Sequence, residues 1–88
     1  MIDLEEYTVE YLDQDWKNKM LNVLRQGKTV KIISRFEDID NLRNELIEQL
    51  LNPIEIDGVE LFYPYIEKIN ITNNECSISL SIREVLHE

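Results

Sequence analysis

Residues 39–51, IDNLRNELIEQLL, decide the fold, because large aliphatic side chains recur there every three or four positions. This spacing predicts an amphipathic helix that ends before Pro53, since proline cannot continue a helix. The apolar stripe of this helix consists of Ile39, Leu42, Leu46, Ile47, Leu50 and Leu51. Arg43 interrupts the stripe, and we expect its stem to lie over the core or its guanidinium to contact a partner.

The residues before this helix predict a strand, a helix and a second strand. Residues 7–12 alternate and favour a strand with one aromatic face, whereas 15–26 have the apolar spacing of a helix that ends at Gly27. Asp13 or Asp15 is expected to start that first helix. Residues 29–35 then predict a strand, and 34–37, SRFE, have the form of a capping box that starts the long helix.

The residues after Pro53 predict strands joined by tight turns. Asp57-Gly58 favours a two-residue hairpin turn, and a second hairpin is expected from about Tyr65 to Arg83. Tyr63-Pro64-Tyr65 is expected to break the strand, and the serines at 77, 79 and 81 are expected to face water. The whole chain, 1–88, therefore predicts a single α+β domain, with two helices packed on one face of a four- or five-stranded, mostly antiparallel sheet.

Charge is distributed in three blocks along the chain. Residues 1–15 carry a net charge of −6, residues 16–35 carry +6 and residues 36–88 carry −9, so the whole chain is at −9. A molecule this acidic repels nucleic acid and anionic lipid, because both are bound through cations that displace counterions. The same field attracts basic protein surfaces, although acidity also serves solubility alone.

Residues that could carry out chemistry are few. Two glycines cannot build a phosphate-binding loop, and one cysteine, Cys76, with one histidine, His87, cannot supply a zinc site. The acid clusters at 13–15 and 37–40 lie at helix starts, where carboxylates complement the helix dipole. We therefore expect no enzymatic activity, no catalytic residue, no metal and no cofactor. The acidic N-terminus and the lack of a long apolar stretch favour a cytoplasmic protein without direct membrane binding.

The candidate partner-binding residues lie on the polar side of the long helix. Carboxylates and amides one helical turn apart, about 5.4 Å, approximate the spacing of phosphates along a DNA strand. Tyrosines near the proline at 64 add aromatic side chains of the kind found at interface hot spots. The expected partner-binding residues are Glu37, Asp38, Asn41, Glu45, Glu48, Tyr63 and Tyr65.

These observations favour a small acidic, non-enzymatic protein that docks on a basic, nucleic-acid-binding surface of another protein and blocks it. In size and charge it is comparable with DNA-mimic inhibitors such as phage-encoded anti-CRISPR and anti-restriction proteins, and the absence of alanine fits an AT-rich bacterial or phage genome. If phage-encoded, it would act in the host cytoplasm. The alternatives are a structural or regulatory module, homodimeric through a strand edge or the basic block, and a toxin-neutralising immunity protein.

Overall fold

The computed structural model describes residues 7–84, and it describes the side chains of all of these except residues 59–61. His87 therefore lies outside the described residues. The elements are β1 (Tyr7–Glu10), α1 (Trp16–Arg25), β2 (Val30–Ser34), a 3-10 turn η1 (Phe36–Asp38), α2 (Ile39–Leu50), β3 (Ile54–Ile56), β4 (Val59–Ile71) and β5 (Cys76–Glu84).

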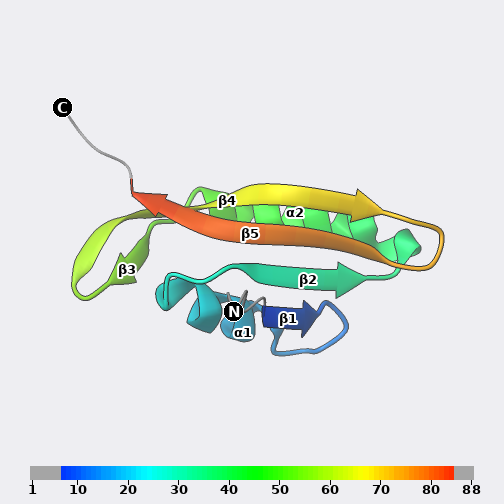
Figure 1. Cartoon of the computed structure of the whole chain (residues 1–88), viewed down its shortest axis with the longest axis horizontal. Helices are drawn as coiled ribbons and strands as arrows, with labels where there is room; N and C mark the ends of the chain where they lie inside the picture. Colours follow the sequence, from blue (N-terminus) through cyan, green and yellow to red (C-terminus); the bar gives the residue numbers. More distant parts are fainter. Residues whose placement is uncertain (1–6, 85–88) are drawn as a thin grey trace, which may run out of the picture.

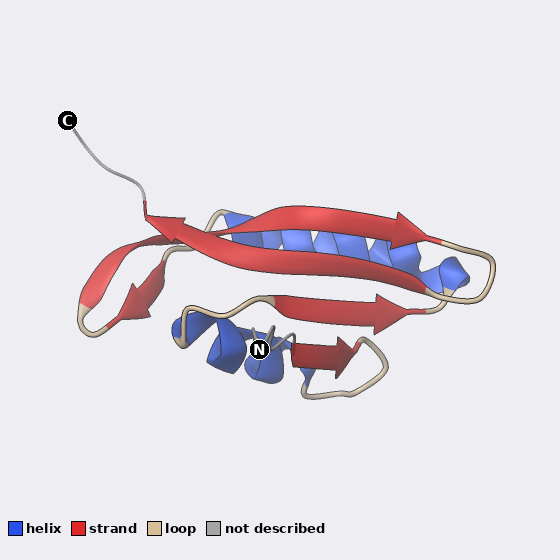
Figure 2. Ribbon diagram, in the orientation of Figure 1, coloured by secondary structure: helices blue, strands red, loops and turns tan. Residues whose placement is uncertain are grey.

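The strands form one five-stranded sheet in the order β1-β2-β5-β4-β3 (Figure 1). Only β1 and β2 are parallel, because α1 connects them as a crossover, and the other three pairings are antiparallel. Both helices pack on the same face of this sheet, and α2 runs along the two long strands β4 and β5 (Figure 2). The expected α+β class, with two helices on one face of a mostly antiparallel sheet, is confirmed.

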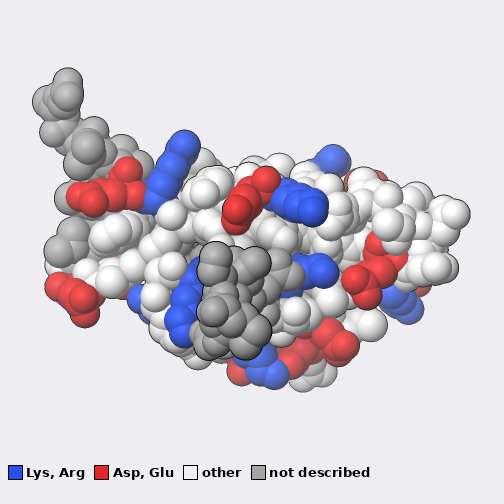
Figure 3. Space-filling view, viewed as in Figure 1, with Lys and Arg blue, Asp and Glu red and all other residues white. Residues whose placement is uncertain are grey.

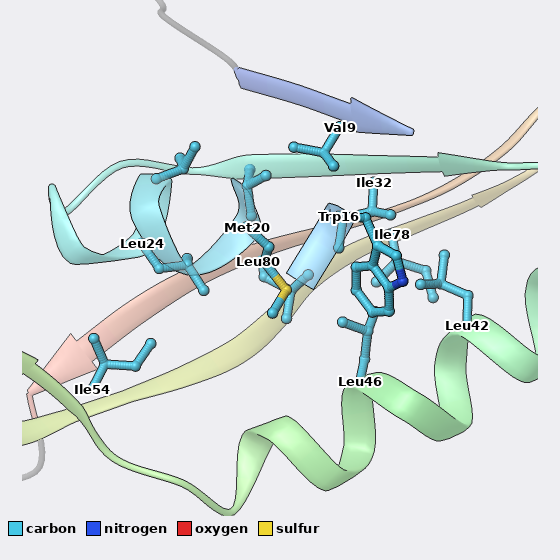
Figure 4. Close-up of a cluster of buried hydrophobic side chains, with 12 residues drawn as sticks. Val9, Trp16, Met20, Leu24, Ile32, Leu42, Leu46, Ile54, Ile78 and Leu80 are labelled. Atoms are coloured by element: carbon cyan, nitrogen blue, oxygen red, sulfur yellow. The ribbon is translucent and has the colours of Figure 1, made fainter. Parts of the chain in front are cut away.

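The core lies between the two helices and the sheet (Figure 4). Met20 and Leu24 of α1 and Leu42 and Leu46 of α2 are almost completely buried. They meet strand residues that share one face of the sheet, including Val9, Ile32 and Ile78, which are aligned across β1, β2 and β5. The helical and strand periodicities of the sequence therefore converge on one cluster of side chains.

The turn between β3 and β4 has the predicted geometry. Asp57 and Gly58 take φ values of 52° and 80°, which the expected two-residue hairpin turn requires. The strand that follows does not break at Tyr63-Pro64-Tyr65, so that expectation is wrong. Pro64 pairs with Ile82 of β5, and β3 no longer runs beside β4 at this point. A proline without an N–H is tolerated there, because that side of β4 is an edge.

The expectation that the serine face of β5 meets water is wrong for Ser77 and Ser79, whereas Ser81 is partly exposed. Ser77 and Ser79 are only 3% and 8% exposed. Strand β5 lies in the middle of the sheet, where the larger side chains of β2 and β4 on either side shield these small ones.

The start and the outer edge of the long helix also differ from expectation. No side-chain cap forms at residues 34–37, because Ser34 is held in β2 opposite Cys76 and donates its hydroxyl to the Arg35 carbonyl. The chain instead enters α2 through η1. Ile47 and Leu51, which were expected to widen the buried stripe, are 47% and 78% exposed, because the sheet beneath α2 is not wide enough to cover them.

Candidate functional site

Helix α2 presents a polar outer side, because Leu42 and Leu46 anchor its opposite side in the core. We define the α2 outer face as the exposed residues Glu37, Asp40, Asn41, Asn44 and Glu48. At about 100° per residue, the helical members lie within roughly 60° of the direction opposite Leu46. Three carboxylates and two amides therefore follow one side of the helix.

The flank of α2 that faces α1 contains Glu45, a carboxylate with two partners from the start of the chain. The Tyr11 hydroxyl donates to Oε2 of Glu45 at 2.5 Å, and Nζ of Lys17 lies 3.5 Å from Oε1. This hydrogen bond, with partial burial, raises the pKa of Tyr11 to about 12. Glu45 thus connects α2 to the start of α1 and is less available to a partner than the sequence suggests.

At the N-terminal end of the long helix, two carboxylates contact one arginine. Nε of Arg35 donates to Oδ2 of Asp38 at 2.9 Å, and Nη1 lies 3.1 Å from Oε1 of Glu37. The Asp38 side chain is only 17% exposed, whereas that of Glu37 is 68% exposed. Asp38 is therefore mainly an internal partner of Arg35, and Glu37 remains accessible.

The two tyrosines lie on the opposite face of the sheet from α2. Tyr63 and Tyr65 pair with Arg83 and Ser81 of β5, whose side chains point away from the helices, and the Arg83 guanidinium lies 5.5 Å from the centre of the Tyr65 ring. In the orientation of Figure 3, in which α2 lies behind the strands, cationic and anionic side chains alternate over the surface. The predicted residues thus form two separate sets, five near α2 and two tyrosines beyond the sheet.

Asp40 and Arg43 lie on the flank of α2 away from α1. Neither was predicted from the sequence to belong to the partner-binding site. Asp40 is 80% exposed at its side chain and lies 3.5 Å from Nη2 of Arg43, which is itself 53% exposed. The Arg43 guanidinium thus reaches water and a neighbouring acid. Asp40 belongs to the acid cluster at 37–40, which the sequence places at the helix start. The local sequence does not show which flank of a helix the sheet leaves uncovered.

Groups that could bind a metal or act as a thiol nucleophile were sought among the described residues. No three His, Cys, Asp or Glu side chains among residues 7–84 gather as a metal site would require. Cys76 is completely buried. An open hollow of about 660 Å³ lies where the end of α1 meets the β3–β4 turn, with Arg25, Phe62 and Ile82 among its lining residues. It places no nucleophile next to a base.

Comparison with protein-family models, with curated proteins and with solved structures finds no match to this chain. Among the helices in the part of the chain that the structure describes, none is long and apolar enough to cross a membrane.

Proposed function

We propose that the protein is a small acidic, non-enzymatic binding protein that docks its α2 outer face on a basic, nucleic-acid-binding surface of another protein and blocks it. The observation that carries this proposal is the row of exposed carboxylates and amides along a helix that the core holds rigidly. Twelve residues of α helix extend about 18 Å, which covers several phosphates of a DNA strand.

The ion pairs within the chain refine the set of partner-binding residues. Among the described residues, Glu48 has no ion pair, while Glu37 and Asp40 have only exposed ones with arginine. Exposed pairs of this kind stabilise a fold by about 0 to 1 kcal/mol, so a basic partner can replace them at little cost. Glu45 and Asp38, in contrast, contribute mainly to the fold. We therefore assign the docking contacts to Glu37, Asp40, Asn41 and Glu48.

The net charge of −9 supports the same proposal. Charge of one sign increases the association rate with an oppositely charged surface and makes binding sensitive to salt. A partner that normally binds nucleic acid carries the required cations. Docking should consequently weaken as salt rises, and duplex DNA or RNA should compete for the same surface.

The test is affinity capture from a lysate of the cells that carry the gene, with three baits. The wild-type chain is compared with an α2 variant, Glu37→Gln/Asp40→Asn/Glu48→Gln, and with a control variant, Glu55→Gln/Glu75→Gln/Glu84→Gln. Both variants move the net charge from −9 to −6, and the control carboxylates are exposed on other elements.

The proposal expects the wild-type and control baits to capture a nucleic-acid-binding protein that duplex DNA elutes, and the α2 variant to lose it. Circular dichroism establishes that all three baits are folded. Equal capture by the control and α2 variants would mean that net charge, and not the α2 outer face, directs binding. Capture that DNA does not elute would contradict the blocking of a nucleic-acid site.

A further inference from the structure

Strand β4 has a long open edge. β3 pairs with β4 only between Val59 and Phe62, whereas β4 continues to Ile71. No described strand lies beside β4 from Tyr63 to Ile71 on the side away from β5. An unpaired edge exposes backbone N–H and C=O groups, which can pair with a further strand.

Apolar side chains accompany this edge on the helix face of the sheet. Ile69 and Ile71 are 44% and 59% exposed, although their cross-strand neighbours Ile78 and Cys76 are completely buried. The sheet therefore brings large aliphatic groups to its rim, where the fold leaves them in water at a cost of about 25 cal/mol for each Å² exposed.

Helix α2 adds an apolar side chain to the same rim. Ile47 lies about 200° around the helix from Glu45, the residue that contacts α1. Ile47 thus faces away from α1, on the flank toward the β4 edge, and it is 47% exposed. We define the β4 seam as Arg43 and Ile47 of α2 together with Ile69 and Ile71 of β4.

The charges around the seam balance, which sets it apart from the molecule as a whole. Arg43 is paired with Asp40, and Lys68 follows Glu67 on β4. Two acids and two bases leave this rim neutral, whereas the chain carries −9. A second copy of the chain can therefore approach here without the repulsion that it meets elsewhere.

Pro64 and a β-bulge limit how the edge can pair. The bulge between Ile66 and Lys68 interrupts the register with β5, and Pro64 has no N–H to donate. A regular ladder is therefore available only from Lys68 to Ile71. Four residues a side are too few for a stable interface, which usually buries at least about 1,200 Å² in total, so the flank of α2 must take part.

We propose that the β4 seam joins two copies of the chain about a two-fold axis. Residues 68–71 of the two copies pair antiparallel, and Ile47, Ile69 and Ile71 of each copy are covered by the other. A second copy fits this surface because an antiparallel pairing of identical strands is self-complementary and because the rim is neutral. This interface lies on a flank of α2 and leaves most of the α2 outer face accessible, so it stands or falls independently of the proposed docking.

The test is sedimentation equilibrium of the wild-type chain and three single variants, over micromolar to millimolar concentrations. Ile69→Lys and Ile71→Lys place a charge in the seam, at side chains that already contact water. Leu12→Lys is the matched control, because Leu12 is 62% exposed in the loop before α1 and lies outside the seam. Circular dichroism establishes which variants fold, and Ile71→Lys, the more exposed of the two positions, replaces Ile69→Lys if that variant unfolds.

The wild-type chain and Leu12→Lys are expected to be dimers. Each folded seam variant is expected to have a dimer dissociation constant at least tenfold higher than that of the wild-type chain. Salt should leave the dimer unchanged or tighten it, because it screens the repulsion between two acidic copies. A wild-type chain that is monomeric at millimolar concentration would overturn the proposal. So would a dimer that both seam variants retain, or one that Leu12→Lys disrupts as strongly as they do.

Discussion

The two flanks of α2 differ in what covers them. On one flank Glu45 is bonded to Tyr11 and Lys17, so this chain itself completes the contacts of the helix. On the other flank Ile47 is 47% exposed, on the side of the open edge of β4. The polar flank is therefore part of the fold, whereas the apolar flank and the α2 outer face are left exposed by the chain itself. Residues two positions apart on one helix thus have different consequences when they are changed.

The largest effect is expected at the buried side of the helix. Leu46→Ala should lower the free energy of unfolding by about 2 to 5 kcal/mol, because it removes completely buried methyl groups and leaves a cavity. Ile47→Ala, at the next residue, should cost less than about 1 kcal/mol, since nearly half of this side chain is already in water. Chemical denaturation measures both, at a protein concentration at which sedimentation finds the chain monomeric. Equal losses at the two positions would mean that the orientation of α2 is wrong.

The next effect concerns the hydrogen bond from Tyr11, in the turn before α1, to Glu45 of α2. Tyr11→Phe removes the hydroxyl that donates to Glu45 and should cost about 1 to 2 kcal/mol, because hydrogen bonds to charged groups stabilise by somewhat more than neutral ones. Tyr65→Phe is the control, since its hydroxyl has no hydrogen-bond partner among the described residues. If the two phenylalanine variants are equally stable, the bond to Glu45 does not hold the polar flank.

The same hydrogen bond makes stability depend on pH in the alkaline range. The folded chain raises the pKa of Tyr11 from 10.0 to about 12 through its bond to Glu45. The folded state thus keeps a proton that the unfolded state loses, and stability falls as pH rises from about 10 to about 12. Below pH 10 this contribution is fully present. Denaturation across this range should give a steeper decline for the wild-type chain than for Tyr11→Phe, and parallel curves would argue against the shift.

A smaller difference is expected between two glutamates on the same helix. Glu45→Gln should cost about 1 kcal/mol, because it weakens the bonds to Tyr11 and Lys17. Glu48→Gln should change stability by less than about 0.5 kcal/mol, since Glu48 is exposed and has no ion pair among the described residues. Both changes remove one charge from α2, so urea titration separates the local contact from the net charge. A cost at Glu48 as large as that at Glu45 would remove the distinction between the two.

Much of the fold could be predicted from the sequence, because local patterns specify it. The spacing of Leu42 and Leu46, the turn at Asp57-Gly58 and the alternation of β5 each determine an element without knowledge of its neighbours. Errors arose where an element depends on what lies beside it. Pro64 is tolerated because β3 has ended, and Ser77 is buried because β5 is central. Strand order is a long-range property that one sequence does not reveal.

The candidate site was less predictable for the same reason. Periodicity placed Glu45 and Glu48 on the polar side of the helix, but the partners of Glu45 come from β1–α1, more than twenty residues away. The exposure of Ile47, Ile69 and Ile71 depends on which strand forms the edge of the sheet. A wide apolar stripe in the sequence is compatible with a fully buried helix side and with one that is partly exposed. Which of the two forms depends on how wide the sheet beneath the helix is.

The central claim is that the α2 outer face occupies a nucleic-acid site on its partner. The most direct measurement is displacement of labelled duplex DNA from the captured partner by the wild-type chain, the α2 variant and the control variant. We predict that the wild-type and control chains displace the DNA at similar concentrations, and that the α2 variant requires at least tenfold more, about 1.4 kcal/mol. Displacement by all three at the same concentration, or no displacement by the wild-type chain, would contradict the claim.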